Sequence, residues 1–150
     1  MKVYRISKCK YIDDLSGTGS ATFAGRWHSK GTHVLYTAAT PSLALLESVA
    51  HMAKVALDGY CMITLDIPTD TIQEPEIQSM PDNWQQNPSP DSLKVFGDLF
   101  ILKNEGLELK LPSVIMPEDF NYLINPNHKD FKKVKVLSKR NLFIDGRLFK

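Results

Sequence analysis

Alternating apolar and polar positions along the chain predict more strands than helices. The first alternating run is Val3-Tyr4-Arg5-Ile6, and a longer β-type run from Tyr60 to Ile67 ends at Pro68. Pro112 interrupts a later run, and Asp145-Gly146 is typical of a hairpin turn within the last one. The predicted strands cover residues 3–6, 33–37, 60–67, 107–115, 119–124, 134–137 and 142–148.

Two stretches have the apolar spacing of a helix and begin with the same signal. Thr40-Pro41 and Ser89-Pro90 each place a hydroxyl N-cap before a proline in the first turn. We expect one helix over residues 42–56 and another over 91–104, with Gly106 as the C-terminal stop of the second. One half of the first helical wheel is apolar and consists of Leu43, Leu45, Leu46, Val49, Ala50 and Ala53.

The order of these elements predicts the fold class. Strands outnumber helices and do not alternate with them, which favours an α+β fold around a mixed or mainly antiparallel sheet. A length of 150 residues fits one domain, residues 1–150. Residues 13–25 are expected to form a loop. Residues 68–91 contain five prolines and are expected to form a long, lid-like connection.

The amino-acid composition is typical of a soluble globular protein and does not indicate one particular function. Hydrophobic residues make up 43% and charged residues 23% of the chain, as in a typical soluble protein. The net charge is +1, but residues 129–150 carry a net charge of +6 and residues 1–128 a net charge of −5. The total therefore does not suggest a nucleic-acid partner, whereas the basic C-terminal segment suggests a docking surface for an acidic one.

Cysteines, histidines and apolar runs suggest a cytoplasmic protein without a metal. Cys9 and Cys61 are too few for a disulfide framework or a four-ligand zinc site, and Cys61 is expected to be a small buried apolar residue. No signal peptide opens the chain, and no run approaches the length of a membrane span. His28 and His33 lack metal-ligand spacing and are expected to be solvated loop residues.

Two segments carry residues that suit phosphate binding. Arg26 lies between a glycine and Trp27, where it could bind a phosphate with two hydrogen bonds or simply stack on the indole at the surface. The Gly-Thr-Gly-Ser run at residues 17–20 resembles a phosphate cradle, but an ordinary flexible loop is favoured.

Glu47 and Tyr36 are further candidates for a functional site. Glu47 lies at the edge of the apolar face of its helix, either as a partly desolvated functional acid or as a boundary residue paired with His51. Tyr36 could offer its ring face to a flat ligand or be an ordinary strand aromatic residue.

Taken together, these segments resemble the RES domain family. The resemblance rests on residues 25–31 (Gly-Arg-Trp-His-Ser-Lys-Gly), 34–38 (Val-Leu-Tyr-Thr-Ala) and 41–47 (Pro-Ser-Leu-Ala-Leu-Leu-Glu). Residues 111–115 resemble the serine strand of the family, and residues 121–128 end in a block similar to its Asn-Pro-x-His block. Similarity extends over residues 2–146.

The resemblance implies an ADP-ribosyltransferase-like fold that consumes NAD as a substrate and needs no other cofactor. Arg26 would hold the NAD phosphates, Tyr36 would stack on the nicotinamide, and Glu47 would be the essential acid. Ser113 would hydrogen-bond the nicotinamide-ribose region, and Arg5 would be an additional NAD contact.

The implied function is that of a toxin that cleaves the nicotinamide–ribose bond of NAD, by hydrolysis or phosphorolysis, and so arrests growth. Its partner would be a cognate helix-turn-helix antitoxin of the Xre type, with which it forms an oligomer. The family motif usually reads Gly-Gly-Arg-Trp-Asn, whereas this chain has Ala24 at its first position and His28 at its last. This departure bears on the fine positioning of the motif residues and not on the activity. Two alternatives are a protein ADP-ribosyltransferase and a non-catalytic module that binds through the basic C-terminal face. Direct nucleic-acid binding is not expected.

Overall fold

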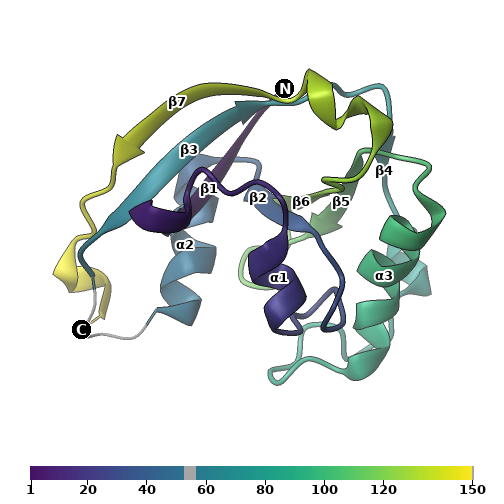
Figure 1. Cartoon of the computed structure of the whole chain (residues 1–150). Coiled ribbons are helices and arrows are strands. Elements are labelled where there is room, and N and C mark those ends of the chain that lie inside the picture. The colour runs from purple at the N-terminus through teal and green to yellow at the C-terminus, as the bar shows by residue number, and fades with distance from the viewer. Residues whose placement is uncertain (53–56, 150) are drawn as a thin grey trace.

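The computed structural model describes residues 1–52 and 57–149, and within them seven strands form one sheet (Figure 1). The strands lie in the order β4-β5-β6-β2-β1-β3-β7. All pairs are antiparallel except β4 with β5, so the predicted α+β fold with a mixed sheet is confirmed. The strands are β1 (Lys2–Lys8), β2 (Leu35–Ala38), β3 (Tyr60–Asp66), β4 (Ile72–Gln73), β5 (Glu108–Pro112), β6 (Phe120–Ile124) and β7 (Lys135–Asn141).

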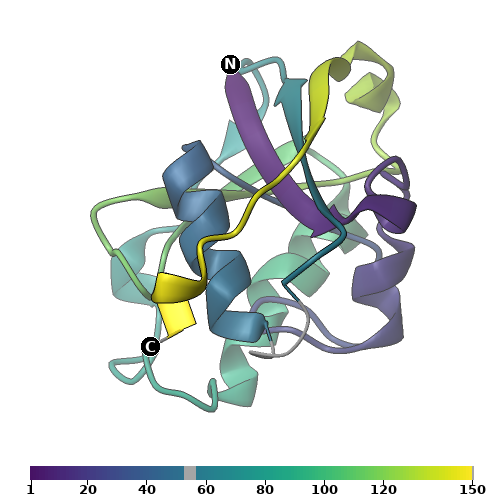
Figure 2. The same ribbon diagram turned by 90° about the vertical axis from the view of Figure 1, so that its left-hand side faces the viewer.

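Helices α2 (Pro41–His51) and α3 (Lys94–Lys103) cover the same face of the sheet (Figure 1). Leu43 of α2 packs with Ala38 of β2, and Phe100 of α3 packs with Leu123 of β6. Because Tyr36 pairs with Leu123, and strand side chains alternate between faces, Tyr36 and Ala38 point to the face that both helices cover. Figure 2 shows α2 lying across the strands beneath it.

The first helix begins as predicted but buries a narrower face. Thr40 caps it by accepting a hydrogen bond from the Leu43 backbone N–H, and Pro41 occupies the first turn. Leu43 and Ala44 are its buried residues, whereas Leu46 of the predicted apolar half is 38% exposed. The prediction for residues 53–56 lies outside the described residues.

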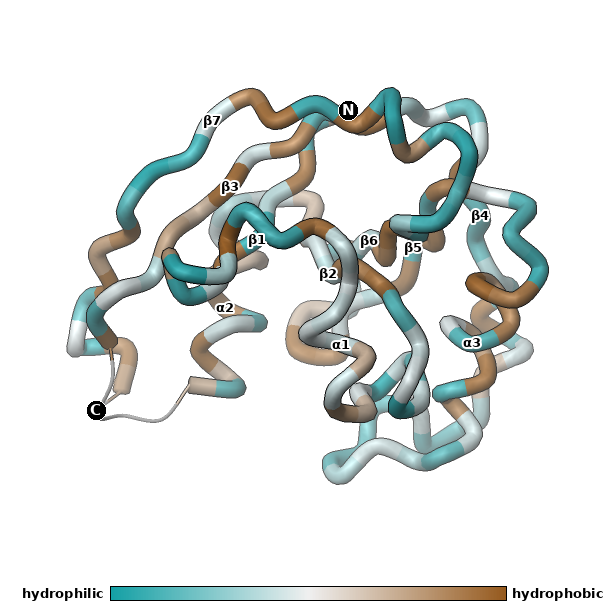
Figure 3. The backbone as a smooth tube through the Cα atoms, viewed as in Figure 1, coloured by the Kyte–Doolittle hydropathy of each residue, from teal (hydrophilic) through white to brown (hydrophobic). Residues whose placement is uncertain are grey.

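The opposite face of the sheet carries the larger core. Strands β1, β2, β3 and β6 contribute alternate apolar side chains to it, and two short 3-10 helices, η1 (Cys9–Tyr11) and η4 (Lys129–Lys133), lie near it. Figure 3 shows how hydrophobic and hydrophilic segments alternate along the backbone. The fully buried residues of this larger core include Val3, Ile12, Ile63, Leu65, Leu107 and Ile124.

Several predicted boundaries are wrong for physical reasons. Residues 18–22, expected in a loop, form the short helix α1 (Thr18–Thr22), because the Ser20 hydroxyl is bound to the backbone of Val34. The α3 helix ends at Asn104 in the left-handed conformation and not at Gly106. Residues 142–148, expected as a strand, include part of the 3-10 helix η5 (Gly146–Phe149).

Other segments agree more closely with the predictions from the sequence. The connection over residues 68–91 is mostly irregular, with only β4 and the short 3-10 helix η2 (Ile77–Ser79) inside it. Another 3-10 helix, η3 (Asp91–Leu93), leads directly into α3. No helix among the described residues is both long and apolar enough to cross a bilayer.

The two cysteines form a disulfide, which the local sequence does not predict. Cys61 is buried as predicted, but its sulfur is bonded to that of Cys9. The antiparallel register explains the approach, since Lys8 at the end of β1 pairs with Tyr60 at the start of β3. A separation of 52 residues along the chain hides this proximity from local pattern.

Candidate functional site

A tight turn presents Arg26 at the surface and anchors Trp27 in the core. The Gly25 N–H donates to the His28 carbonyl at 3.1 Å, which closes the turn. Trp27 is buried against Trp84 and Phe96, with ring centroids 6.4 Å and 6.0 Å away. The turn is therefore fixed from below, and the Arg26 side chain projects from a rigid base.

The Arg26 guanidinium is held by the long connection that follows β3. Its Nη1 donates to the carbonyls of Trp84 at 2.8 Å and Gln86 at 2.9 Å. These carbonyls belong to residues 68–91, so this connection contacts the side chain expected to bind phosphate, and its lid-like role stays a prediction. Ala24, which replaces a glycine of the motif, does not adopt a left-handed conformation. Its side chain therefore creates no backbone strain.

Tyr36 and His28 form one hydrogen-bonded unit. His28 is buried, so the prediction of a solvated loop residue is wrong. Its Nε2 lies 2.7 Å from the Ser20 carbonyl and 3.0 Å from that of Phe23, and two carbonyl acceptors require that Nε2 carry a hydrogen. The other ring nitrogen, Nδ1, lies at hydrogen-bond distance from the Tyr36 hydroxyl, 2.7 Å away. Burial raises the pKa of Tyr36, which keeps this hydroxyl protonated.

Glu47 is fixed by two donors from distant parts of the chain. The Ser113 hydroxyl donates to Glu47 Oε1 at 2.7 Å, and Asn121 Nδ2 donates to the same oxygen at 2.7 Å. Ser113 directly follows β5, and Asn121 lies in β6 opposite Ala38. Of the two readings of Glu47, the pairing with His51 does not fit the structure, because the carboxylate is directed to Ser113 and Asn121 and His51 is exposed.

Arg26, Tyr36 and Glu47 interact electrostatically. Partial burial lowers the pKa of Arg26, while the nearby Glu47 carboxylate and the Tyr36 hydroxyl favour its charged form. Tyr36 and Asn121 point to the same face of the sheet because Ala38, two residues after Tyr36, pairs with Asn121. A cation, an aromatic ring and a carboxylate therefore converge on one side of the molecule.

Arg5 lies apart from this group, and its NAD contact stays a prediction. Tyr4 pairs with Ala38 and shares its face, so the next residue, Arg5, points to the opposite face. Its Nη1 donates to the Ile12 carbonyl at 3.3 Å, and burial lowers its pKa. The strand register and the alternation of side chains therefore place Arg5 and Tyr36 on opposite faces of the sheet.

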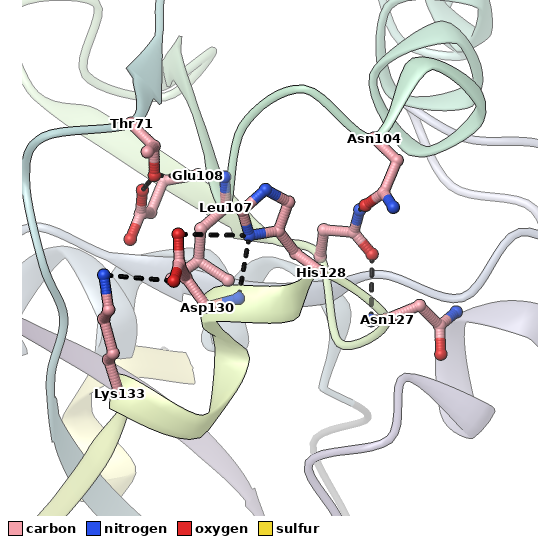
Figure 4. Close-up of polar contacts among 9 residues, drawn as sticks. Thr71, Asn104, Leu107, Glu108, Asn127, His128, Asp130 and Lys133 are labelled. Carbon is pink, nitrogen blue, oxygen red and sulfur yellow. Dashed lines mark hydrogen bonds and ion pairs between the residues drawn. The ribbon is translucent and has the colours of Figure 1, made fainter.

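The Asn-Pro-x-His block forms a separate polar cluster around Glu108 (Figure 4). Asn125 donates to Asn104 Oδ1 at 2.7 Å and its side-chain oxygen accepts the Asn127 N–H, which ties the end of α3 to the end of β6. His128 Nδ1 accepts the Asp130 N–H and caps η4. Because Glu108 pairs with Ile124, it points to the face opposite Asn121, so the sheet separates this cluster from Glu47.

Two residues of the site escape sequence reasoning. Asn121 is one polar residue in a strand, and nothing near it in sequence indicates a carboxylate partner 74 residues away. His28 does carry a signal, since it lies within the Arg26 motif, but its burial depends on the packing of α1. The described residues include no cluster of three or more His, Cys, Asp or Glu side chains that could share a metal ion.

Known proteins that are similar to this chain share one family. The RES domain matches residues 2–145. Toxin Res of Photorhabdus laumondii is 32% identical over 154 aligned residues, which cover 100% of this chain and 98% of the relative. The Prs ADP-ribosylating toxin of a Sphingobium species is 32% identical over 143 residues, covering 92% of this chain and 88% of the relative.

The fold also occurs in a solved structure. A chain of the MbcT–MbcA toxin–antitoxin complex of M. tuberculosis superposes with a TM-score of 0.76 and 15% identity, covering 94% of this chain and 83% of that chain. At this identity the likeness concerns the fold alone. The match over residues 2–145 and the relatives that align along nearly the whole length show that this chain belongs to the RES domain family.

Proposed function

We propose that this protein is the toxin of a toxin–antitoxin pair and that it cleaves NAD at the nicotinamide–ribose bond. The observation that carries the proposal is the convergence of Arg26, Tyr36 and an oriented Glu47 carboxylate on one face of the sheet. NAD is the substrate in this proposal, and no cofactor or metal is required. The membership of the family and the toxin names of its relatives support the biological role.

The proposed chemistry needs few groups. Nicotinamide carries a positive charge in NAD and leaves as a neutral molecule with the bonding electron pair, so no acid has to protonate it. The ribosyl cation that develops resembles the intermediate of glycoside hydrolysis and requires a nearby fixed negative charge. Glu47 supplies that charge, Arg26 holds the diphosphate, and the Tyr36 ring supports the nicotinamide. Water or phosphate then attacks C1′, and water loses a proton in doing so.

The direct test is the release of nicotinamide from NAD by the purified protein. We expect release with wild type in a buffer that contains phosphate, so that either acceptor is available, and a loss of at least about 1,000-fold in Glu47→Gln because the charge that stabilises the cation is gone. Arg26→Ala should lose a similar amount through weaker binding of the diphosphate. Glu105→Gln and Arg147→Ala, at exposed positions, are matched controls that should keep full activity. Absence of nicotinamide with folded wild type contradicts the proposal.

A second candidate function is protein ADP-ribosylation. The Sphingobium relative, 32% identical over 92% of this chain, bears the name ADP-ribosylating toxin, which favours this possibility. NAD labelled in the adenosine half distinguishes the two reactions in a cell extract. Label that becomes acid-precipitable with protein indicates a transferase, and label that stays in a small molecule indicates cleavage by water or phosphate.

We further propose a helix-turn-helix antitoxin of the Xre type as the partner, docked on β7 in an oligomeric complex. All seven residues of β7 are exposed, and the strand lies at the edge of the sheet. Val136 and Leu137 are 55% and 48% exposed beside Lys135 and Arg140, which suits an acidic partner with some apolar residues. Co-purification that weakens steeply with salt supports this surface, whereas a salt-insensitive complex contradicts it.

A further inference from the structure

The Ser113 hydroxyl has a fixed direction because both of its acceptor positions are occupied. The backbone N–H groups of Ile115 and Met116 each donate to Ser113 Oγ at 3.1 Å. A hydroxyl has one hydrogen and two lone pairs, so the hydrogen is the one group left, and it points to Glu47 Oε1. Ser113 is fully buried, and its role in the structure is to orient the carboxylate.

Asn121 provides a second donor with a different anchor. Its side-chain Nδ2 can only donate, and it does so to Glu47 Oε1 at 2.7 Å. The backbone of Asn121 pairs with Leu111 of β5 on one side and with Ala38 of β2 on the other, so the residue sits inside the sheet. Two rigid donors on one oxygen leave Oε1 no freedom to rotate and leave Oε2 as the oxygen available for a ligand.

We propose that Asn121 is a positioning residue for the reaction, which holds Glu47 so that Oε2 faces the ribosyl cation. The proposal rests on the proposed function, in which Glu47 stabilises that cation. Two hydrogen bonds confine a carboxylate to one rotamer, whereas one leaves it able to pivot about the remaining contact. Asn121 therefore acts through Glu47 and does not touch the substrate, and its effect belongs to the transition state.

The first test separates catalysis from binding in Asn121→Ala. We expect kcat for nicotinamide release to fall about 10- to 100-fold, while KM for NAD stays within about twofold, because Arg26 and Tyr36 remain in place. In a Glu47→Gln background the same substitution should cause no further loss. Asn127→Ala, at an exposed asparagine, is the matched control and should keep wild-type kcat.

Asn121→Asp offers a readout that a purely structural residue would not give. The new carboxylate faces Glu47 and repels it near neutral pH, which should lower kcat more than the alanine does. At lower pH a proton shared by the two carboxyls can replace the missing amide hydrogen, so kcat of this variant should recover relative to wild type.

The possible outcomes are distinguishable. A wild-type kcat in a folded Asn121→Ala, or a pH profile of Asn121→Asp that is parallel to that of wild type, overturns the positioning role while the proposed function stands. A change in KM alone also overturns it, because it assigns Asn121 to substrate binding. Absence of nicotinamide release by wild type overturns both proposals at once. Far-UV circular dichroism and thermal unfolding verify that each variant is folded.

Discussion

The hydroxyl and the ring of Tyr36 have different tasks. The hydroxyl is bound to His28, so this polar contact serves the scaffold. The ring face is what remains for a ligand. In this chain an imidazole occupies the motif position where the family usually has an amide, and it reaches Ser20, Phe23 and Tyr36 together. The imidazole therefore joins Tyr36 to two backbone carbonyls of the same region.

Gly97 is the residue that lets α3 approach the turn carrying Arg26. Its N–H, in the first turn of α3, donates to the Trp27 carbonyl at 2.9 Å. A Cβ added at Gly97 would lie 2.1 Å from that carbonyl oxygen, which belongs to the backbone and cannot rotate away. No side chain fits here without movement of the helix or the turn.

We therefore expect Gly97→Ala to lower the free energy of unfolding by about 2–3 kcal/mol and to reduce nicotinamide release by displacing Arg26. Urea denaturation and the nicotinamide assay measure the two effects. Gly19→Ala is the control, because a Cβ there meets nothing within 4 Å and lies in a helix, so its stability should be unchanged or slightly higher. Equal stability of the two variants would contradict this account of the contact.

At the scale of the element, the Thr40 side chain stabilises the start of α2. The Thr40 hydroxyl accepts the Leu43 N–H at 3.1 Å and donates to Asp119 Oδ2 at 3.3 Å, which joins the start of α2 to the residue before β6. Because Glu47 lies in α2 and Asn121 in β6, this hydroxyl links the two elements that meet at the site.

Thr40→Ala should lower the free energy of unfolding by about 1 kcal/mol, since it removes the helix cap. Thr40→Ser keeps the hydroxyl and should stay within about 0.5 kcal/mol of wild type. Chemical denaturation of the three proteins at one pH gives the comparison. If the serine variant is destabilised as much as the alanine variant, the hydroxyl is not the stabilising group.

Local sequence encodes elements far better than it encodes the contacts between them. The start of α2 was predictable because a cap and a proline act over four residues. Residues 142–148 alternate like a strand, yet β7 ends at Asn141, and Phe143 is 86% exposed. The candidate site follows the same rule: Glu47 is visible at the edge of a helix face, but its partners lie 66 and 74 residues away and are brought near by strand register.

At the scale of the whole molecule, the sheet separates two polar regions of different character. On one face, Ser113 and Asn121 donate hydrogen bonds that orient the Glu47 carboxylate. On the other, Glu108 is fully buried, its Oε2 accepts a hydrogen bond from Thr71 at 3.2 Å, and its Oε1 has no hydrogen-bond partner among the described residues. Burial, with the negative charges of Asp70 and Asp130 nearby, raises the pKa of Glu108 to about 7 (Figure 4).

This carboxyl should make global stability depend on pH. Below about pH 4.5 the Glu108 carboxyl is neutral in both the folded and the unfolded state, so it does not lower the stability. Between about pH 4.5 and 7 it ionises in the unfolded chain first, so the free energy of unfolding falls by up to about 3 kcal/mol. Glu108→Gln cannot ionise, so its stability relative to wild type should rise between pH 5 and 8. Glu74→Gln, an exposed carboxylate paired with Lys110, should show a constant difference over that range. Urea unfolding at four pH values measures the free energy of unfolding of each protein. If that free energy changes with pH in parallel for wild type and Glu108→Gln, Glu108 titrates normally and the prediction is wrong.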